Sequence, residues 1–117
     1  MSYLPGTHII ATLHAGNTGK MVSYENCKKA IDALIGDFGL HKLGEVYHDF
    51  TPEGFTAVVC LSESHLSIHT WPEHNKVNLD IYLSNFRRSN DETVVKIYEA
   101  LVNYFEATPE SCETIYR

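Results

Sequence analysis

The densest cluster of reactive side chains in this sequence runs from Ser62 to Glu73 and reads Ser-Glu-Ser-His-Leu-Ser-Ile-His-Thr-Trp-Pro-Glu. It holds three serines, two histidines, two glutamates and the only tryptophan, and it directly follows the apolar run 55–61. A polar side chain beside a buried strand needs a hydrogen-bond partner or costs about 1–3 kcal/mol. The cluster therefore indicates either a strand–turn–strand with one polar face or a reactive site.

The residue types of this cluster are compatible with three kinds of chemistry. A metal site on His65 and His69 lacks a third ligand at a typical spacing and lacks the HExxH helix pattern, so no metal is expected. A serine hydrolase of the nucleophile-elbow type needs G-x-S-x-G, which is absent from the sequence. In the third kind, self-processing, a serine hydroxyl attacks the carbonyl of the preceding residue while a nearby histidine and hydroxyls assist.

The stretch from Leu61 to Glu73 resembles the diagnostic motif of the short bacterial and archaeal S-adenosylmethionine decarboxylases. Those proteins are self-cleaving, pyruvoyl-dependent lyases of polyamine and spermidine biosynthesis. The resemblance extends to the chain length, the Gly-x-His start (6–10), the Phe-x-Pro-x-Gly turn (50–54) and the Asp-hydrophobic-aromatic segment (80–82). It implies a decarboxylase made as a zymogen.

The resemblance implies cleavage of one domain, residues 1–117, into a β chain (1–63) and an α chain (64–117). Ser64 Oγ attacks the carbonyl of Glu63 to form an ester. Removal of the Cα proton, β-elimination and hydrolysis then leave a pyruvoyl group at position 64. That group forms a Schiff base with the amine of the substrate and takes up the electrons released as CO2 leaves.

The resemblance also gives the remaining site residues their roles. His69 is the base of self-cleavage or its close helper, and Thr56 matches a family serine that stabilises the oxyoxazolidine intermediate. The substrate-binding residues are Phe50 and Trp71, which would flank the adenine ring, Glu73, which would accept hydrogen bonds from the ribose, and His8. Sites of this family form between two protomers, so we expect a homodimer of cleaved protomers with His8 at the seam.

Two residues depart from the family pattern. Ser84 stands where the family has the cysteine that donates the proton after decarboxylation; a thiol, with a pKa near 8.5, is a far better acid than an alcohol. Thr12 stands where the family has an acidic residue. Cys60 could replace the missing donor, but we expect it, like Cys27 and Cys112, to be a small buried hydrophobe.

These departures leave three hypotheses. The first is an S-adenosylmethionine decarboxylase proenzyme. The second is a pyruvoyl-dependent decarboxylase of arginine or ornithine, and the third is an uncleaved, non-catalytic homologue that binds or regulates. The presence of Glu63, Ser64 and His69 favours the catalytic hypotheses.

Hydrophobic periodicity predicts the elements that position these residues. A helix is expected after an N-cap at Ser23 and before a C′ glycine at Gly39, and a second helix is expected from Ser89, with Glu92 completing a capping box. The expected strands are 7–14, 40–50, 55–61, 66–71, 77–83 and an edge strand at 112–116.

The short connections between these strands require a mainly antiparallel sheet. Two amphipathic helices on one face make an α+β two-layer sandwich, and a second copy of the chain is expected to cover the other face. Composition agrees with one folded domain: 117 residues, 44% hydrophobic and 21% charged.

Nine basic against fifteen acidic residues give a net charge of −6, which argues against a nucleic-acid binder. The sequence has no apolar run of the roughly 20 residues that span a bilayer, and no signal peptide at its start. A cytoplasmic location is therefore expected.

Overall fold

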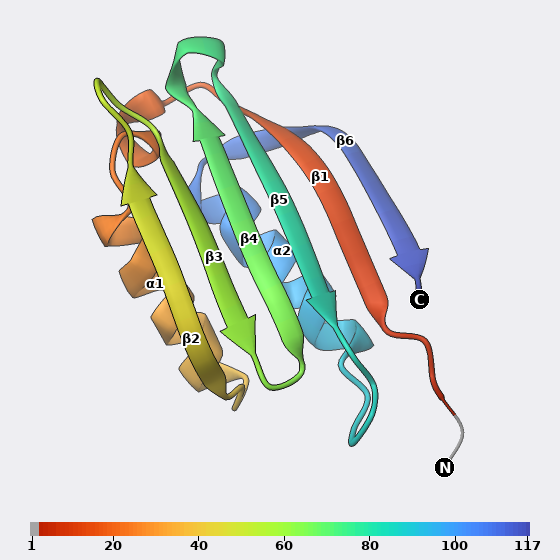
Figure 1. Cartoon of the computed structure of the whole chain (residues 1–117). Helices are drawn as coiled ribbons and strands as arrows, with labels where there is room; N and C mark the ends of the chain where they lie inside the picture. The colour runs from red at the N-terminus through yellow and green to blue at the C-terminus, as the bar shows by residue number, and fades with distance from the viewer. Residues whose placement is uncertain (1–2) are drawn as a thin grey trace.

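The structure, a computed structural model, describes residues 3–117, which form a six-stranded sheet and two α-helices (Figure 1). The sheet order is β2-β3-β4-β5-β1-β6, and every neighbouring pair is antiparallel. This confirms the predicted α+β sandwich. The elements are β1 (Thr7–Ala15), η1 (Thr18–Met21), α1 (Glu25–Asp37), β2 (Lys42–Asp49), β3 (Phe55–Leu61), β4 (Ser64–Trp71), η2 (Pro72–His74), β5 (Lys76–Leu83), α2 (Asp91–Tyr104) and β6 (Ala107–Tyr116).

The core lies between the sheet and the two helices, which cover the same face of the sheet (Figure 1). Alternation along the strands produces this arrangement, because successive side chains point to opposite faces. In β5, for example, Val77, Leu79, Ile81 and Leu83 are buried, while the residues between them are partly exposed. Within residues 3–117, no helix has both the length and the apolar character that crossing a membrane requires.

The start of α1 differs from the prediction. Ser23 does not cap the helix, because its hydroxyl donates a hydrogen bond to Asp49 Oδ2 (2.9 Å) at the end of β2. The other carboxylate oxygen of Asp49 accepts the backbone N–H of Tyr24 (2.9 Å), so the helix is capped from a distant strand. Gly39 follows the helix with a φ of 63°, as predicted for a C′ glycine.

The start of α2 differs as well. The predicted capping box of Ser89 and Glu92 is wrong, because the helix begins at Asp91 and is preceded by Asn90, whose side chain makes no cap. The Asn90 amide instead donates to the carbonyl of Ser84 (2.8 Å) and to the carboxylate of Glu63. The helix is thus tied to the ends of the neighbouring strands.

No helix of residues 3–117 covers the opposite face of the sheet (Figure 1), and we call it the open face. Its apolar residues Ile10, Val46 and Val58 lie in one cross-strand row with Ser67 and Asp80. Val46 is 67% exposed, and Val58 and Ile10 are each 41% exposed. Such a row is typical of a surface that a second chain covers.

The expectation of three buried cysteines was correct only for Cys27. Cys60 is exposed on β3, where alternation turns its side chain to the open face. Cys112 is exposed because it lies on the edge strand β6. The apolar run 55–61 is therefore buried at every second residue rather than throughout.

Candidate active site

The bond between Glu63 and Ser64 lies at the end of the tight turn that joins β3 to β4. Ser64 has a φ of 141°, in a region that residues with a side chain adopt at a cost of about 1–3 kcal/mol. The carbonyl oxygen of Glu63 accepts the backbone N–H of Ser84 at 2.7 Å. The carbonyl that self-cleavage would attack is therefore held by a hydrogen-bond donor next to a strained serine.

The side chain of Glu63 is held from a loop that follows β5. Arg88 Nη2 lies 3.0 Å from Glu63 Oε1, and the Asn90 amide donates to the other carboxylate oxygen. Burial raises the pKa of Glu63, but the hydrogen bonds from Arg88 and Asn90 outweigh it and hold that pKa below its ordinary value. Sequence reasoning missed both partners, because nothing in the sequence links positions 25 and 27 residues away to this turn.

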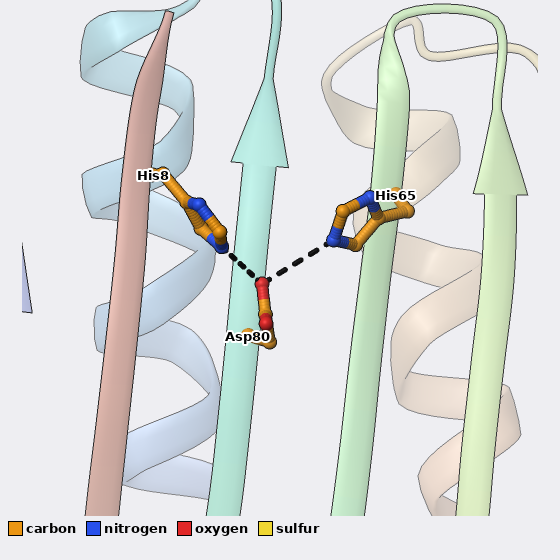
Figure 2. A group of neighbouring side chains, drawn as sticks. All are labelled: His8, His65 and Asp80. Carbon is orange, nitrogen blue, oxygen red and sulfur yellow. Dashed lines mark hydrogen bonds and ion pairs between the residues drawn. The ribbon is translucent and has the colours of Figure 1, made fainter. Parts of the chain in front are cut away.

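Beside Ser64 on the open face, Asp80 lies between two histidines (Figure 2). Its Oδ1 is hydrogen-bonded to Nε2 of the buried His8 and lies 3.3 Å from Nε2 of His65. The other ring nitrogen of His65, Nδ1, lies 3.5 Å from Ser64 Oγ. The register explains the grouping, because His8 and His65 both flank Tyr82 of β5.

The ligand atoms of His8, His65 and Asp80 lie within 4.8 Å of one another, a number and type of ligands that suit zinc. The same atoms already form hydrogen bonds with one another. The sequence did not predict Asp80 as a site residue. Its segment, 80–82, is part of the family resemblance, but its contacts with His8 and His65 depend on the strand register. The two histidines considered as metal ligands in the sequence, His65 and His69, lie in different groups.

A cavity of about 300 Å³ opens at the far end of β4. It brings together five residues predicted for the site: Phe50, Thr56, His69, Trp71 and Glu73. Thr56 Oγ1 lies 3.0 Å from His69 Nδ1. The rings of Phe50 and Trp71 are about half exposed, at 51% and 47%.

The turn 50–54 closes one side of this cavity, which accounts for the Phe-x-Pro-x-Gly pattern. The backbone N–H of Phe50 donates to the carbonyl of Gly54 at 2.8 Å. Gly54 has a φ of 99°, and a Cβ there would lie 3.2 Å from Pro72 Cδ and 3.3 Å from the carbonyl oxygen of Thr70. Only glycine suits both the conformation and the space.

Trp71 belongs to a short chain of hydrogen bonds across three strands. Its Nε1–H donates to Asn78 Oδ1 (2.7 Å), and the Asn78 amide donates to Thr12 Oγ1 (3.1 Å). Thr12, which replaces an acidic residue of the family pattern, thus lies in a neutral network that fixes the indole ring.

The structure places the predicted residues at two ends of one strand. Glu63, Ser64 and Ser84 lie at the start of β4, and His8 lies with them rather than with the cavity residues. Ser64 and His69 are five residues apart on this strand, so about 16 Å of extended chain separates them. Proton transfer between them within one chain is therefore excluded.

The fold and the site define a class: a two-layer α+β protein with a strained Glu-Ser turn and a separate aromatic pocket on one uncovered sheet face. A sequence model described as S-adenosylmethionine decarboxylase matches residues 7–117. The chain belongs to the S-adenosylmethionine decarboxylase family.

Individual proteins that are similar to this chain carry the same family name. The chain is 37% identical over 106 residues to the S-adenosylmethionine decarboxylase proenzyme of Archaeoglobus fulgidus, covering 91% of this chain and 89% of the relative. It is 36% identical over 101 residues to the proenzyme of the same name from Picrophilus torridus, covering 86% and 78%. The crystal structure of the adenosylmethionine decarboxylase from Aquifex aeolicus aligns with a TM-score of 0.79 and 26% identity, covering 99% of this chain and 91% of that one.

Proposed function

We propose that this chain is a proenzyme that cleaves itself between Glu63 and Ser64 and then decarboxylates S-adenosylmethionine for polyamine biosynthesis in the cytoplasm. The observation that carries the proposal is the strained Ser64 next to a carbonyl that already accepts a hydrogen bond from Ser84 N–H (2.7 Å). Cleavage would give the chains 1–63 and 64–117. The pyruvoyl group left at position 64 supplies a carbonyl that bonds to the substrate amine and accepts the electrons released with CO2.

The separation of the two ends of β4 supports a homodimer. Ser64 requires a base for removal of its Cα proton, and His69 of its own chain lies about 16 Å away along the strand. If two open faces pack together about a two-fold axis that runs across the strands, the pocket of one protomer faces Ser64 of its partner. The exposed apolar row with Ile10, Val46 and Val58 would be buried in that interface.

Within this dimer, His69 removes the Cα proton and the adjacent Thr56 hydroxyl stabilises the oxyanion. Their 3.0 Å contact supports the assignment, because the hydroxyl fixes the orientation of the imidazole ring. Ser84 lies at the position of the family's proton donor. Since an alcohol is a poor acid, it would relay a proton from water.

The pocket suits an adenosyl group. The half-exposed rings of Phe50 and Trp71 offer flat surfaces to an adenine, and base–aromatic stacking contributes about 1–3 kcal/mol for each base. Glu73, exposed at the rim, would accept hydrogen bonds from the ribose hydroxyls. The relatives described above are named for S-adenosylmethionine, which favours it over arginine or ornithine.

The departures at Thr12 and Ser84 keep a pyruvoyl-dependent decarboxylase of arginine or ornithine as the second candidate.

Two measurements separate the hypotheses. First, the mass of the purified wild-type chain is followed under denaturing conditions; a single full-length species after long incubation would overturn both catalytic proposals and favour the non-catalytic homologue. Second, CO2 release is compared for carboxyl-labelled S-adenosylmethionine, arginine and ornithine, and we expect release from the first.

A further inference from the structure

We propose that His65, oriented by Asp80, is the base that starts self-cleavage by taking the hydroxyl proton of Ser64 in the same chain. The inference rests on the proposed function and adds a residue that the family resemblance did not assign. It divides the work between two histidines: His65 for formation of the ester, and His69 for the later elimination.

The first support is the position of His65. Its Nδ1 lies 3.5 Å from Ser64 Oγ (Figure 2 shows the ring). Consecutive side chains of a regular strand point to opposite faces, but the φ of 141° takes Ser64 out of that regular geometry. Before a reaction such catalytic contacts are often long and shorten as the reacting group forms.

The second support is the hydrogen bonding of the opposite ring nitrogen. Asp80 Oδ1 lies 3.3 Å from His65 Nε2, and a carboxylate only accepts hydrogen bonds. The proton of a neutral His65 is therefore held on Nε2, which leaves a lone pair on Nδ1 toward Ser64. This is the order of roles that activates a hydroxyl in other nucleophilic sites: an acceptor, an imidazole and an alcohol.

The third support is the buried His8, which is 4% exposed and is hydrogen-bonded to the same carboxylate oxygen. Its Nε2–H fixes Asp80 in a position where Oδ1 can also accept from His65. His8 is thus a positioning residue, two steps from the reacting atoms. This role replaces the expected place of His8 at the substrate.

Ser64 Oγ bonds to the carbonyl carbon of Glu63 as the hydroxyl proton moves to His65 Nδ1. The electron pair of the carbonyl becomes an oxyanion, which the backbone N–H of Ser84 stabilises. The C–N bond then breaks, and the nitrogen of residue 64 takes the proton from His65, so the products are an ester and a free amine.

The alternative base, His69, is excluded for this step within one chain. About 16 Å of strand separates it from Ser64, and its Nδ1 is engaged by Thr56 at 3.0 Å. The base and the Ser84 N–H donor that start ester formation therefore belong to the same chain as Ser64, whereas the Thr56 hydroxyl and the base of the elimination, His69, come from the partner.

The test compares His65→Gln and His69→Gln by denaturing mass spectrometry, with and without hydroxylamine, which cleaves esters but leaves amides intact. We expect cleavage of His65→Gln to slow at least about 100-fold, with the chain resistant to hydroxylamine. We expect His69→Gln to accumulate a form that hydroxylamine cuts after Glu63. His14→Gln, a change on the same face at the far end of β1, should cleave like the wild type.

The role of Asp80 needs a readout that misfolding would not produce. Asp80→Asn should slow cleavage at least about tenfold in the wild-type background and add nothing in the His65→Gln background, since it acts through that ring. Added imidazole should restore cleavage to His65→Gly, which also controls for folding.

Two results would overturn the inference while leaving the proposed function intact: wild-type cleavage rates in His65→Gln, or a hydroxylamine-sensitive ester in that variant. An uncleaved wild-type chain would instead remove the proposed function itself. The two failures are therefore distinguishable in the same experiment.

Discussion

The two ends of β4 differ in whether their functional groups find partners within one chain. At the start of the strand, the Glu63 carboxylate, its carbonyl and the Asp80 carboxylate all have partners within the chain. At the far end, the rings of Phe50 and Trp71 lie half exposed above an open cavity. The first end is prepared to break a bond of its own backbone, whereas the second awaits a ligand and a partner chain.

This difference follows from what each task requires. Self-cleavage reacts two neighbouring groups of one chain, so fixed geometry supplies much of the rate enhancement. Substrate binding needs accessible surface, which a single chain exposes and a dimer can enclose. Changes at the junction and at the aromatic rings of the pocket should therefore have separable effects, whereas His69 lies at the pocket end and still serves cleavage of the partner chain.

The largest effect is expected for Ser64→Ala, which should abolish cleavage while the chain still folds, because no other hydroxyl can form the ester. The matched control is Ser62→Ala, which removes the hydroxyl of an exposed turn residue two positions earlier. The intact mass of each variant under denaturing conditions shows whether it has been cleaved. Fragments from Ser64→Ala, or their absence from Ser62→Ala, would contradict the assignment of the junction.

Loss of an aromatic ring from the pocket end of β4 should leave self-cleavage intact and weaken substrate binding. We expect Trp71→Ala to raise the KM for S-adenosylmethionine about 10- to 100-fold, the loss of one stacking contact of about 1–3 kcal/mol. Phe86→Ala, which removes an exposed aromatic ring outside the pocket, is the control. A cleavage defect in Trp71→Ala would contradict the prediction, because it would show that self-cleavage also depends on the aromatic pocket.

Ser84, at the start of β4, tests the proton donation that follows decarboxylation. Ser84→Cys should raise kcat on S-adenosylmethionine by about tenfold, since a thiol with a pKa near 8.5 donates a proton more readily than an alcohol. Cys60→Ser should leave turnover unchanged. An unchanged kcat in Ser84→Cys, or a loss in Cys60→Ser, would mean that another group supplies the proton.

The smallest effect concerns the Glu63 carboxylate. In the uncleaved Ser64→Ala background, Arg88→Ala should lower the free energy of unfolding by about 0.2–1 kcal/mol at neutral pH, because Arg88 is half exposed. The pKa of Glu63 is depressed below its ordinary 4.5, so this stabilisation is present above that pH and is lost as the pH falls through the folded-state pKa.

Urea unfolding at neutral pH and at about pH 3 measures this difference. The effect of Arg88→Ala should shrink at the lower pH. Arg87→Ala is the control, since Arg87 acts on Glu63 only through its charge and should change stability less. A pH-independent effect would show that Arg88 stabilises the chain through its contacts with the carbonyls of Phe38 and Gly39 instead.

The sequence predicted what depends on local pattern. The apolar, strand-like run 55–61 predicted β3 with its observed bounds, and helical periodicity with Gly39 predicted the end of α1. The residues of the pocket, Phe50, Trp71 and Glu73, were expected from the family resemblance alone, and the structure places all three around one cavity.

What the sequence could not predict depends on register and on competition between partners. Asp80 meets His8 and His65 only because three separate strands pair in one register. Ser23 looked like a cap, but its hydroxyl donates to Asp49 from a distant strand. The Asn90 side chain likewise donates to a distant residue, Glu63, in a turn 27 residues earlier.

The most direct test of the account asks whether the two ends of β4 meet between chains. Ser64→Ala, which keeps its pocket, is co-expressed with His69→Gln, which keeps its junction, and each chain is followed by denaturing mass spectrometry. The account predicts that the His69→Gln chain yields fragments 1–63 and 64–117 only in the presence of the other variant, whose His69 serves it. A His69→Gln chain that stays uncleaved in verified mixed dimers, while the wild type cleaves, would contradict it.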